Sequence, residues 1–377
     1  MEARAAPLQC CQTAVARVAL GAMETTSFDF LSRLLGAPGP SGFEGGPARA
    51  WRDEAGRIAD AVSADVNGNS LATLTAKPGA PTLMFAGHID EIGLMVIHID
   101  DSGYLWFDTI GGWDEQVLVG QRVVLLARGG PVRGVIGKKA IHLMEKEDRE
   151  KPSKVKDLWI DIGAASKAEA SERVRVGDAG VLDSGVLEFP NGRVVSRSID
   201  NRIGAFVVLE ALRLLAKDRP AVTVTAVATT QEEIGYTGGG ARTSATGLAP
   251  TAAIVVDVTH ATDTPGVDKN RHGEVKLGGG PVLSRGSSLN PRVVDLLAEV
   301  AEAEKIPYCW HAAPKFTATD ADAIFSSLRG VATGLVSVPN RYMHSPNEMV
   351  VLEDLDRAAR LLAAFARRVT TETSFIP

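Results

Sequence analysis

The sequence predicts an α/β fold with a mixed, mostly parallel sheet flanked by helices and a small inserted β-domain. Four short apolar runs have the pattern of buried strands, and amphipathic helical stretches lie near them. Between residues 93 and 188, short alternating runs separated by Gly and Asp turns replace this pattern. Strands that alternate with helices favour a parallel sheet covered on both faces, whereas alternating runs joined by turns favour antiparallel strands.

Two helices are predicted where the regular pattern begins. Ser27 is a suitable N-cap for a helix through Leu34 and Leu35, which the Gly- and Pro-containing loop 36–42 ends. A second helix is predicted over Ala48–Val62, because its apolar residues recur at helical spacing. These residues are Trp51, Ala55, Ile58 and Val62.

The central elements follow in order along the chain. The predicted buried strands are Thr82–Ala86, Val222–Ala228, Ala252–Val256 and Gly334–Val338. Further helices are predicted over Ile203–Leu215, Pro291–Glu304 and Leu352–Val369. Asn290 is placed to cap the second of these, and Pro291 suits its first turn, where no backbone N–H is needed.

The change of pattern also predicts the domain boundaries. Residues 93–188 are expected to form the inserted β-rich domain, residues 25–92 and 189–377 the main α/β domain, and residues 1–24 a poorly defined extension. The alternating runs of the insertion are Tyr104–Phe107, Gln121–Ala127, Val132–Ile136 and Leu158–Ile162. The mixed charges of Glu145–Asp157 indicate a solvated loop.

Composition excludes several classes of protein. The chain has 377 residues, 45% of them hydrophobic and 23% charged, which is typical of folded globular proteins. Its formal net charge of −6 argues against general nucleic-acid binding, which needs a positive field. No apolar run approaches the ~20 residues that span a bilayer, so no membrane helix is expected. Cys10, Cys11 and Cys309 offer no disulfide framework, which suits a cytoplasmic protein.

Acidic and histidine residues follow each of the four predicted strands. They are His88 and Asp90 after the first strand, Glu232 and Glu233 after the second, Asp257 at the end of the third and His344 after the fourth. Asp200 precedes the helix predicted from Ile203. Because ligands bind beyond the carboxyl ends of parallel strands, we expect these side chains to form one site.

The residue types in this group indicate a metal centre. The two imidazoles and three of the five carboxylates, without a thiolate, suit zinc, cobalt or manganese as ligands. Five ligands exceed the needs of one tetrahedral catalytic zinc, but they fit two ions bridged by a carboxylate. Three carboxylates, a bridging hydroxide and two divalent ions are together neutral, so their burial costs less than that of bare carboxylates. A lone histidine is more often structural, as we expect for His98, His142, His260, His272 and His311.

The ordered motifs resemble those of the M42 metallo-aminopeptidases, which include glutamyl and tetrahedral aminopeptidases and some proteins named endoglucanases. The matching stretches are Ala86–Gly93, Ser198–Arg202, Gln231–Gly235, Asp257–His260 and Arg341–Ser345, with Pro38–Glu44 and Leu158–Gly163 in addition. The resemblance covers residues 28–365 and implies a two-metal exopeptidase fold, with residues 25–92 and 189–377 as the catalytic domain.

The resemblance also implies a role for each site residue. The metal ligands would be His88, Asp200, Glu233, Asp257 and His344, with Asp200 bridging two divalent ions, zinc or cobalt first and manganese as a further candidate. Glu232 would be the general base, and Asp90 would accept a hydrogen bond from His88. The implied substrates are peptides with a free N-terminus. The inserted domain would mediate dimerisation, in homo-oligomers built from dimers and reaching twelve subunits.

Two segments depart from the family pattern. Thr317–Ala321 reads Thr-Ala-Thr-Asp-Ala where the family has Gly-Gly-Thr-Asp-Ala, so its side chains are expected to narrow the substrate pocket. Tyr236–Gly240 also differs from the shorter segment that usually follows the two glutamates. Neither departure changes an expected ligand.

Three alternative functions remain open from the sequence. One is a related metal-dependent deacylase or amidohydrolase, and another is a non-catalytic assembly protein. The third is a glycosidase, in which Glu232 and Glu233 would be a poor acid/base pair because neighbouring strand residues point to opposite faces. A glycosidase would also need carboxylates about 5–9.5 Å apart across a sugar, and it would leave both histidines without a role.

Overall fold

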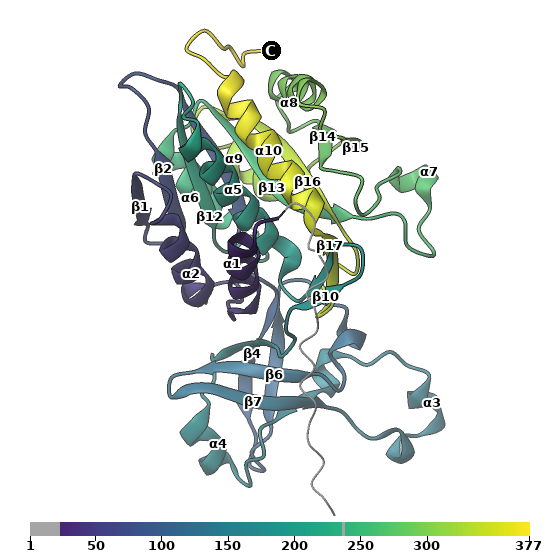
Figure 1. Ribbon diagram of the computed structural model, residues 1–377. Helices are drawn as coiled ribbons and strands as arrows, with labels where there is room; N and C mark the ends of the chain where they lie inside the picture. Colours follow the sequence, from purple (N-terminus) through teal and green to yellow (C-terminus); the bar gives the residue numbers. More distant parts are fainter. Residues whose placement is uncertain (1–22, 236–237) are drawn as a thin grey trace, which may run out of the picture.

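The four predicted buried strands lie side by side in an eight-stranded sheet (Figure 1). The structure is a computed structural model that describes residues 23–235 and 238–377. The strand order is β1 (Ala61–Ala64), β2 (Ser70–Leu74), β12 (Thr223–Thr229), β3 (Thr82–His88), β13 (Ala252–His260), β16 (Ala332–Asn340), β14 (Val282–Gly286) and β15 (Cys309–Ala313). β12, β3, β13 and β16 are mutually parallel, and β2 and β14 flank them in antiparallel pairing. The expected mixed sheet is therefore confirmed, and its four central strands end at the same edge.

Helices cover both faces of this sheet, as predicted. One face is covered by α1 (Thr25–Gly36), α2 (Gly45–Ala55), α5 (Ile199–Lys217) and α10 (Leu352–Arg368), with α8 (Pro291–Ala303) beside α10 (Figure 1). The shorter α6 (Gly239–Leu248) and α9 (Asp320–Phe325) cover the other face with small apolar side chains. Asn290 caps α8 as expected, because its Oδ1 accepts hydrogen bonds from the backbone N–H groups of Arg292 and Val293.

The first two helices differ from the sequence prediction. α1 begins at Thr25, so Ser27 lies inside the helix, and its hydroxyl donates a hydrogen bond to Glu210 of α5 instead of capping. The second predicted helix was too long, because α2 ends at Ala55 and Ala61–Ala64 forms the edge strand β1. Antiparallel pairing of β1 with β2 overrides the helical spacing of Val62, which lies opposite Ala72.

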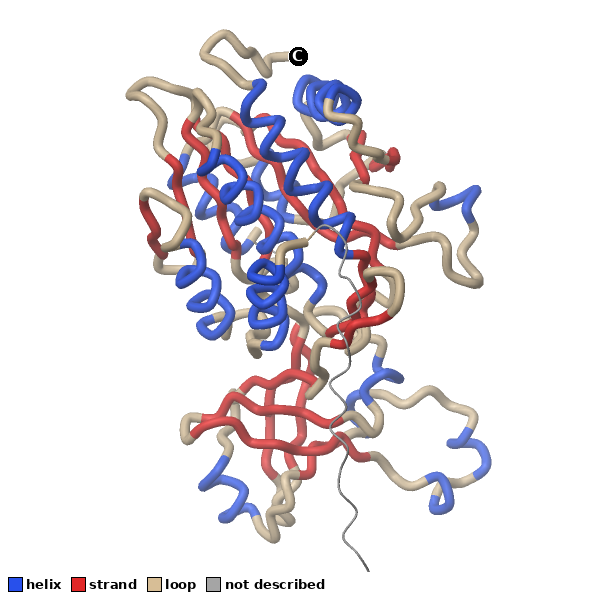
Figure 2. Tube along the Cα trace, viewed as in Figure 1, coloured by secondary structure: helices blue, strands red, loops and turns tan. Residues whose placement is uncertain are grey.

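Residues 93–182 contain a closed six-stranded barrel with its own apolar core, below the larger body in Figure 2. Its strand order is β4 (Gly93–Ile99), β5 (Leu105–Ile110), β8 (Trp159–Asp161), β7 (Gly130–Gly137), β6 (Arg122–Ala127) and β9 (Ala179–Leu182). The short helices α3 (Lys146–Arg149) and α4 (Lys167–Arg173) lie in its connections, α3 within the stretch expected to be a loop. The dimerisation role assigned to residues 93–188 stays a prediction.

The remaining elements connect these two parts. A three-stranded sheet of β10 (Leu187–Phe189), β11 (Arg193–Ser196) and β17 (Glu348–Val351) lies between the barrel and the body, and α7 (Lys269–His272) lies on an outer loop (Figure 1). Among the described residues, no helix is both long enough and apolar enough to cross a bilayer. Of the departing segment 236–240, Tyr236 and Thr237 lie outside the described residues.

Close contact between β3 and α5 positions the sheet edge where the acidic residues gather. A Cβ added to Gly87 would lie 2.4 Å from the carbonyl carbon of Gly204 and 2.6 Å from the backbone nitrogen of Ala205. Both neighbouring atoms belong to the backbone and cannot rotate away. Only glycine therefore allows α5 to approach β3 this closely, next to His88 at the end of the strand.

Gly87→Ala should therefore destabilise the protein by forcing α5 away from β3. We expect the free energy of unfolding, measured by urea titration, to fall by about 3 kcal/mol. The matched control is Gly36→Ala at the end of α1, where an added Cβ would meet no atom within 4 Å. The control should change stability by less than about 0.5 kcal/mol. Equal stability of the two variants would contradict this account of the packing.

Candidate metal centre

The parallel strands bring the predicted site residues together at their carboxyl ends. His88 is the last residue of β3, and Asp257 lies in β13. Glu232 and Glu233 follow β12, and His344 follows β16. Because these strands share one direction, side chains from distant parts of the sequence reach the same edge of the sheet.

Asp200 enters this group from the start of α5, where the helix is not yet regular. The backbone angles of Asp200 and Asn201 are non-helical. The Asn201 Nδ2 group donates a 2.8 Å hydrogen bond to the carbonyl oxygen of Val256, and the Asn201 Oδ1 atom accepts one from the backbone N–H of Gly204. Through this hydrogen bond to Val256, Asn201 holds the adjacent Asp200 close to β13, beside Asp257.

The two carboxylate oxygens of Asp200 face different histidines. Asp200 Oδ1 lies 3.2 Å from His88 Nε2, and Asp200 Oδ2 lies 3.4 Å from His344 Nε2. His344 Nε2 is also 3.3 Å from Glu233 Oε2. A carboxylate placed between two imidazoles in this way has the arrangement that a bridging metal ligand needs.

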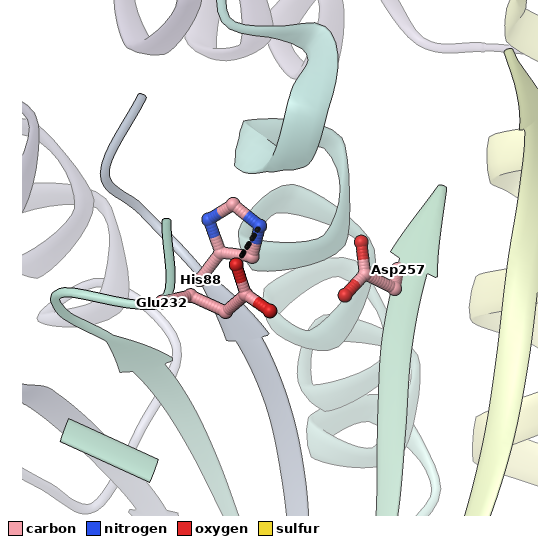
Figure 3. A group of neighbouring side chains, drawn as sticks. All are labelled: His88, Glu232 and Asp257. Atoms are coloured by element: carbon pink, nitrogen blue, oxygen red, sulfur yellow. Dashed lines mark ion pairs between the residues drawn. The ribbon is translucent and has the colours of Figure 1, made fainter. Parts of the chain in front are cut away.

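Two overlapping groups of side chains have ligand atoms close enough to share an ion. His88, Asp200 and Glu233 form one group, and His88, Glu232 and Asp257 form the other, with ligand atoms within 4.8 Å of one another. Figure 3 shows the second group, in which Glu232 Oε2 lies 3.7 Å from His88 Nε2. Geometry alone thus places Glu232, the expected general base, among the possible ligands.

The chemistry of these side chains fits divalent metal ions. The donors are imidazole nitrogens and carboxylate oxygens, which borderline ions such as zinc accept. Glu233 Oε1 is buried and has no hydrogen-bond partner among the described residues. Since an unpartnered buried carboxylate oxygen is costly, a cation at this position would compensate it.

Burial and mutual interaction shift the pKa values of the whole group. Burial raises the pKa of Glu232 and of Asp257 well above the usual range for carboxyl groups. Burial opposes the charged form of His344, but its hydrogen bonds to Asp200 and Glu233 outweigh this effect and raise its pKa to about 11. Without a metal, the positive charge in the group is therefore held on the histidines.

Asp90 connects His88 to the two glutamates. Its Oδ1 accepts a hydrogen bond from the backbone N–H of Glu232, and its Oδ2 accepts hydrogen bonds from the backbone N–H of Glu233 and from Ser41 Oγ. Asp90 Oδ1 lies 3.4 Å from His88 Nδ1, at ion-pair distance but outside hydrogen-bond geometry. The position fits the orienting role expected for Asp90, and it adds a backbone anchor that the sequence did not indicate.

The adjacent glutamates both reach the site. We expected neighbouring strand residues to point to opposite faces, but Glu232 and Glu233 lie beyond the end of β12. There Glu232 faces His88 and Glu233 faces His344. The expectation was wrong because the alternation of a strand does not continue into the turn that follows it.

Two groups that orient the ligands were missed by the sequence analysis. The buried carboxylate of Glu348 accepts 2.9 Å hydrogen bonds from the backbone N–H groups of Asp200 and His344. Nδ1 of His344 lies 2.6 Å from the carbonyl oxygen of Gly112, so it donates to that oxygen and leaves Nε2 free to bind a metal. Glu348 could have been noticed as an acidic residue within an apolar strand, but a backbone carbonyl leaves no sequence signal.

Glu44 holds the loop that carries the glutamates. Its Oε1 accepts hydrogen bonds from the backbone N–H groups of Gln231 and Gly42. Gln231 has a φ of +62°, a conformation that is unfavourable for residues other than glycine. Burial, together with the nearby charge of Asp90, raises the pKa of Glu44 to about 7.

A second buried cluster lies behind the ligands. The Glu91 carboxylate contacts Arg197 Nη1 at 2.5 Å and Arg202 Nη2 at 2.7 Å, and all three side chains are at least nine-tenths buried. Arg197 also donates to the carbonyl oxygen of Gly36, and Arg202 to that of Leu34. Because Glu91 follows Asp90 and the arginines flank Asp200, this cluster fixes two segments of the site relative to each other.

A cavity of about 410 Å³ opens beside the metal centre. Its lining includes Glu232, Glu233 and His344 from the centre, together with Gly112 of the barrel side. Arg242 of α6 also lines the cavity, together with Ala318, Thr319, Asp320, Asp322 and Ala323. Ala321, within the same segment, belongs to the apolar core instead. Ala318 and Thr319, from the segment that departs from the family pattern, do line this space.

Comparison with known proteins identifies relatives over most of the chain. The family model for M42 glutamyl aminopeptidases matches residues 68–361. A lysyl aminopeptidase of Pyrococcus furiosus is 34% identical, over 89% of this chain and 96% of the relative.

Solved structures of similar proteins share the fold. The TET aminopeptidase of the marine sediment archaeon Thaumarchaeota archaeon SCGC AB-539-E09 is 35% identical, with a TM-score of 0.87 over 92% of this chain and 97% of its own. The TET1 peptidase of Pyrococcus horikoshii, which can assemble into a tetrahedron or a large octahedral shell, is 30% identical, with a TM-score of 0.80 over 91% and 100% of the two chains.

The buried cluster behind the ligands leads to a stability prediction. Glu91→Gln would leave two buried guanidinium groups without their counter-charge, so the free energy of unfolding should fall by about 3–5 kcal/mol. Asp60→Asn is the matched control, because Asp60 pairs with Arg219 through two hydrogen bonds at the exposed surface. Urea titration should show a change below about 1 kcal/mol for this variant. A comparable loss in both variants would refute the structural importance of the Glu91 cluster.

Proposed function

The chain belongs to the M42 family of glutamyl aminopeptidases and is a peptide-bond hydrolase, and we propose that it removes N-terminal residues from peptides by a two-metal mechanism. The observation that carries the mechanism is the position of Asp200 between His88 and His344. One carboxylate with an oxygen toward each imidazole supports two ions that share this ligand.

The proposed ligand sets follow from these contacts. His88, Asp200 and Asp257 would hold one divalent ion, and Asp200, Glu233 and His344 would hold the other, with zinc or cobalt as first candidates and manganese as a third. Ions bound there would lower the pKa of a water molecule and polarise the carbonyl group of the scissile peptide bond. Asp90 keeps His88 oriented, and Gly112 does the same for His344.

Glu232 is proposed as the general base. Its side chain is 18% exposed and lines the cavity beside the centre, whereas Glu233 is turned toward His344. Burial raises the pKa of Glu232, which makes its carboxylate a stronger proton acceptor. Glu232 would accept a proton from the attacking water and return it to the departing amine.

The family and its named relatives favour this function over a glycosidase. Glu232 and Glu233 both face histidines, which supports a metal centre and would leave these histidines without a role in a glycosidase. Turnover of an aminoacyl nitroanilide that disappears on chelation and returns with zinc, cobalt or manganese would support the aminopeptidase. Cleavage of a glucan that is insensitive to chelation would support the glycosidase instead.

The two adjacent glutamates should separate catalysis from metal binding. Glu232→Gln should lower kcat for an aminoacyl nitroanilide by about 10²–10⁴-fold, because proton transfer by this residue is lost. Its metal content, measured by elemental analysis after dialysis, should stay at the wild-type level. Glu233→Gln is the matched control and should lose metal as well as activity. Unchanged turnover by Glu232→Gln would rule out the proposed base.

We also propose that the protein forms homo-oligomers built from dimers, up to a dodecamer. Residues 93–182 expose several large apolar side chains, on the barrel strands and on their connections, which a partner subunit would cover. They include Ile97, Val135, Ile141, Leu143 and Val176. The similar TET1 peptidase of Pyrococcus horikoshii can assemble into a tetrahedron or a large octahedral shell.

Light scattering on the purified protein tests this assembly. The expected result is a mass that is an even multiple of the subunit mass, because dimers are the building unit. Leu143→Glu changes a side chain that is 69% exposed in the connection between β7 and β8, and it should shift the mass toward smaller species if this connection takes part in the interface. A monomeric mass for the unmodified protein at micromolar concentration would contradict the proposal.

A further inference from the structure

We propose that Asp320 binds the α-ammonium group of the peptide substrate and so restricts the enzyme to free N-termini. This inference rests on the proposed aminopeptidase function. The observation behind it is a buried carboxylate that faces the same cavity as Glu232 and that pairs with no Lys or Arg in the described part of the chain.

The backbone around Asp320 is held firmly in place. Asp320 is the first residue of α9, and Thr319 Oγ1 caps this helix by accepting a hydrogen bond from the backbone N–H of Ala321. The preceding turn is fixed by Asp322, whose carboxylate accepts hydrogen bonds from the backbone N–H groups of Thr317 and Ala318. Ala318 has a φ of +55° in this turn. The segment therefore presents Asp320 in a defined position.

The carboxylate of Asp320 is only partly satisfied by the protein. The residue is 4% exposed, and Thr229 Oγ1 donates a hydrogen bond to its Oδ2. Among residues 23–235 and 238–377, Thr229 is the hydrogen-bond donor to this carboxylate, and the charged groups that act on it are His88 and Asp90, with no Lys or Arg paired to it. A buried carboxylate in this situation is costly unless a cation joins it.

Asp320 differs from the metal ligands and from the other acid of the pocket wall. It belongs to neither group of side chains whose ligand atoms are close enough to share an ion. Asp322, which lines the same cavity, has its carboxylate occupied by the backbone of the turn and by Ser288 Oγ. Asp320 is therefore the acid of this wall that retains capacity for a ligand.

The α-ammonium group of a peptide suits this position chemically. It is a compact cation with N–H donors, and its usual pKa is about 7.7–8.0, so much of it is charged at neutral pH. The first peptide bond is only two bonds away from this nitrogen, along Cα and the carbonyl carbon. A substrate anchored at Asp320 would thus present its first peptide bond to Glu232 in the same cavity, whereas an acylated N-terminus would offer no charge.

A comparison of two inhibitors tests the contact directly. Leucine hydroxamate and 4-methylpentanoic hydroxamate share the metal-binding group and the side chain, and they differ only in the amine. With the metal-loaded protein, we expect the amine to strengthen inhibition by at least about 30-fold. In Asp320→Asn, which keeps the size of the side chain, this ratio should fall to within about threefold of unity, because the coupling between amine and carboxylate is lost.

Two further variants separate binding from structure. Asp320→Glu keeps the charge and should recover part of the ratio. Asp60→Asn removes a surface carboxylate that pairs with Arg219 outside this cavity, and it should leave the ratio at the wild-type value. An equal loss of affinity for both inhibitors in Asp320→Asn would show a structural role and overturn the proposal. Lysine hydroxamate serves as a third inhibitor. If Asp320→Asn lowered the affinity for this inhibitor alone, the proposal would also be overturned, because Asp320 would then bind a basic side chain of the substrate.

Failure of this inference can be distinguished from failure of the proposed function. If the metal-loaded wild-type protein cleaves no aminoacyl nitroanilide, the aminopeptidase proposal itself is wrong. If the wild-type protein cleaves these substrates but binds both leucine-type inhibitors equally, only the role of Asp320 is wrong. Cleavage of N-acetylated and free aminoacyl substrates at the same rate would likewise overturn the role of Asp320.

Discussion

The buried contact of Glu91 with Arg197 and Arg202 is the constraint on which the rest of the site depends. It joins three segments that are distant in sequence: the last turn of α1, the residues that follow β3 and the start of α5. Asp90 precedes Glu91, and Asp200 lies between the two arginines. The positions of Asp90 and Asp200 are thus fixed by one cluster of ion pairs whose side chains belong to neither group of candidate metal ligands. Because charged groups inside a protein are stable only when paired, the cluster forms as a unit.

The same logic extends from this cluster to the ligands. Asp90 and Glu348 are buried carboxylates that accept hydrogen bonds from backbone N–H groups. Asp90 accepts them from Glu232 and Glu233, and Glu348 accepts them from Asp200 and His344. Each therefore fixes the main chain of a functional residue rather than its side chain. The carbonyl oxygen of Gly112 adds a contact from the barrel side and selects the tautomer of His344. The insertion thus contributes to the candidate centre through its backbone.

The sequence predicted those features that depend on neighbouring residues, and it did not predict features that depend on contacts between distant parts of the chain. The central strands and the residues at their ends followed from apolar runs and the direction of parallel strands, so His88 and Asp257 were placed from their own neighbourhoods. The extension of the second helix to Val62 was wrong because pairing with β2 decides that segment. Glu91 was not singled out, since its partners lie more than 100 residues away. Gly112 could not be found because its backbone carries the contact.

Several residues near the candidate metal ligands have backbone conformations that are unfavourable for residues other than glycine. Ser198, Gln231 and His344 all have positive φ angles near 60°, which cost non-glycine residues free energy. Each is next to or within the metal centre, and buried acceptors compensate two of them, since Glu44 accepts from Gln231 and Glu348 accepts from His344. Ser198 is held through its hydroxyl, which donates to the carbonyl oxygen of Leu35. These bonds do not involve a metal ion, so the protein itself supplies the free energy that positions the ligands. Ions would then enter a site whose geometry already exists, and their binding energy would be available to offset the mutual repulsion of the buried carboxylates.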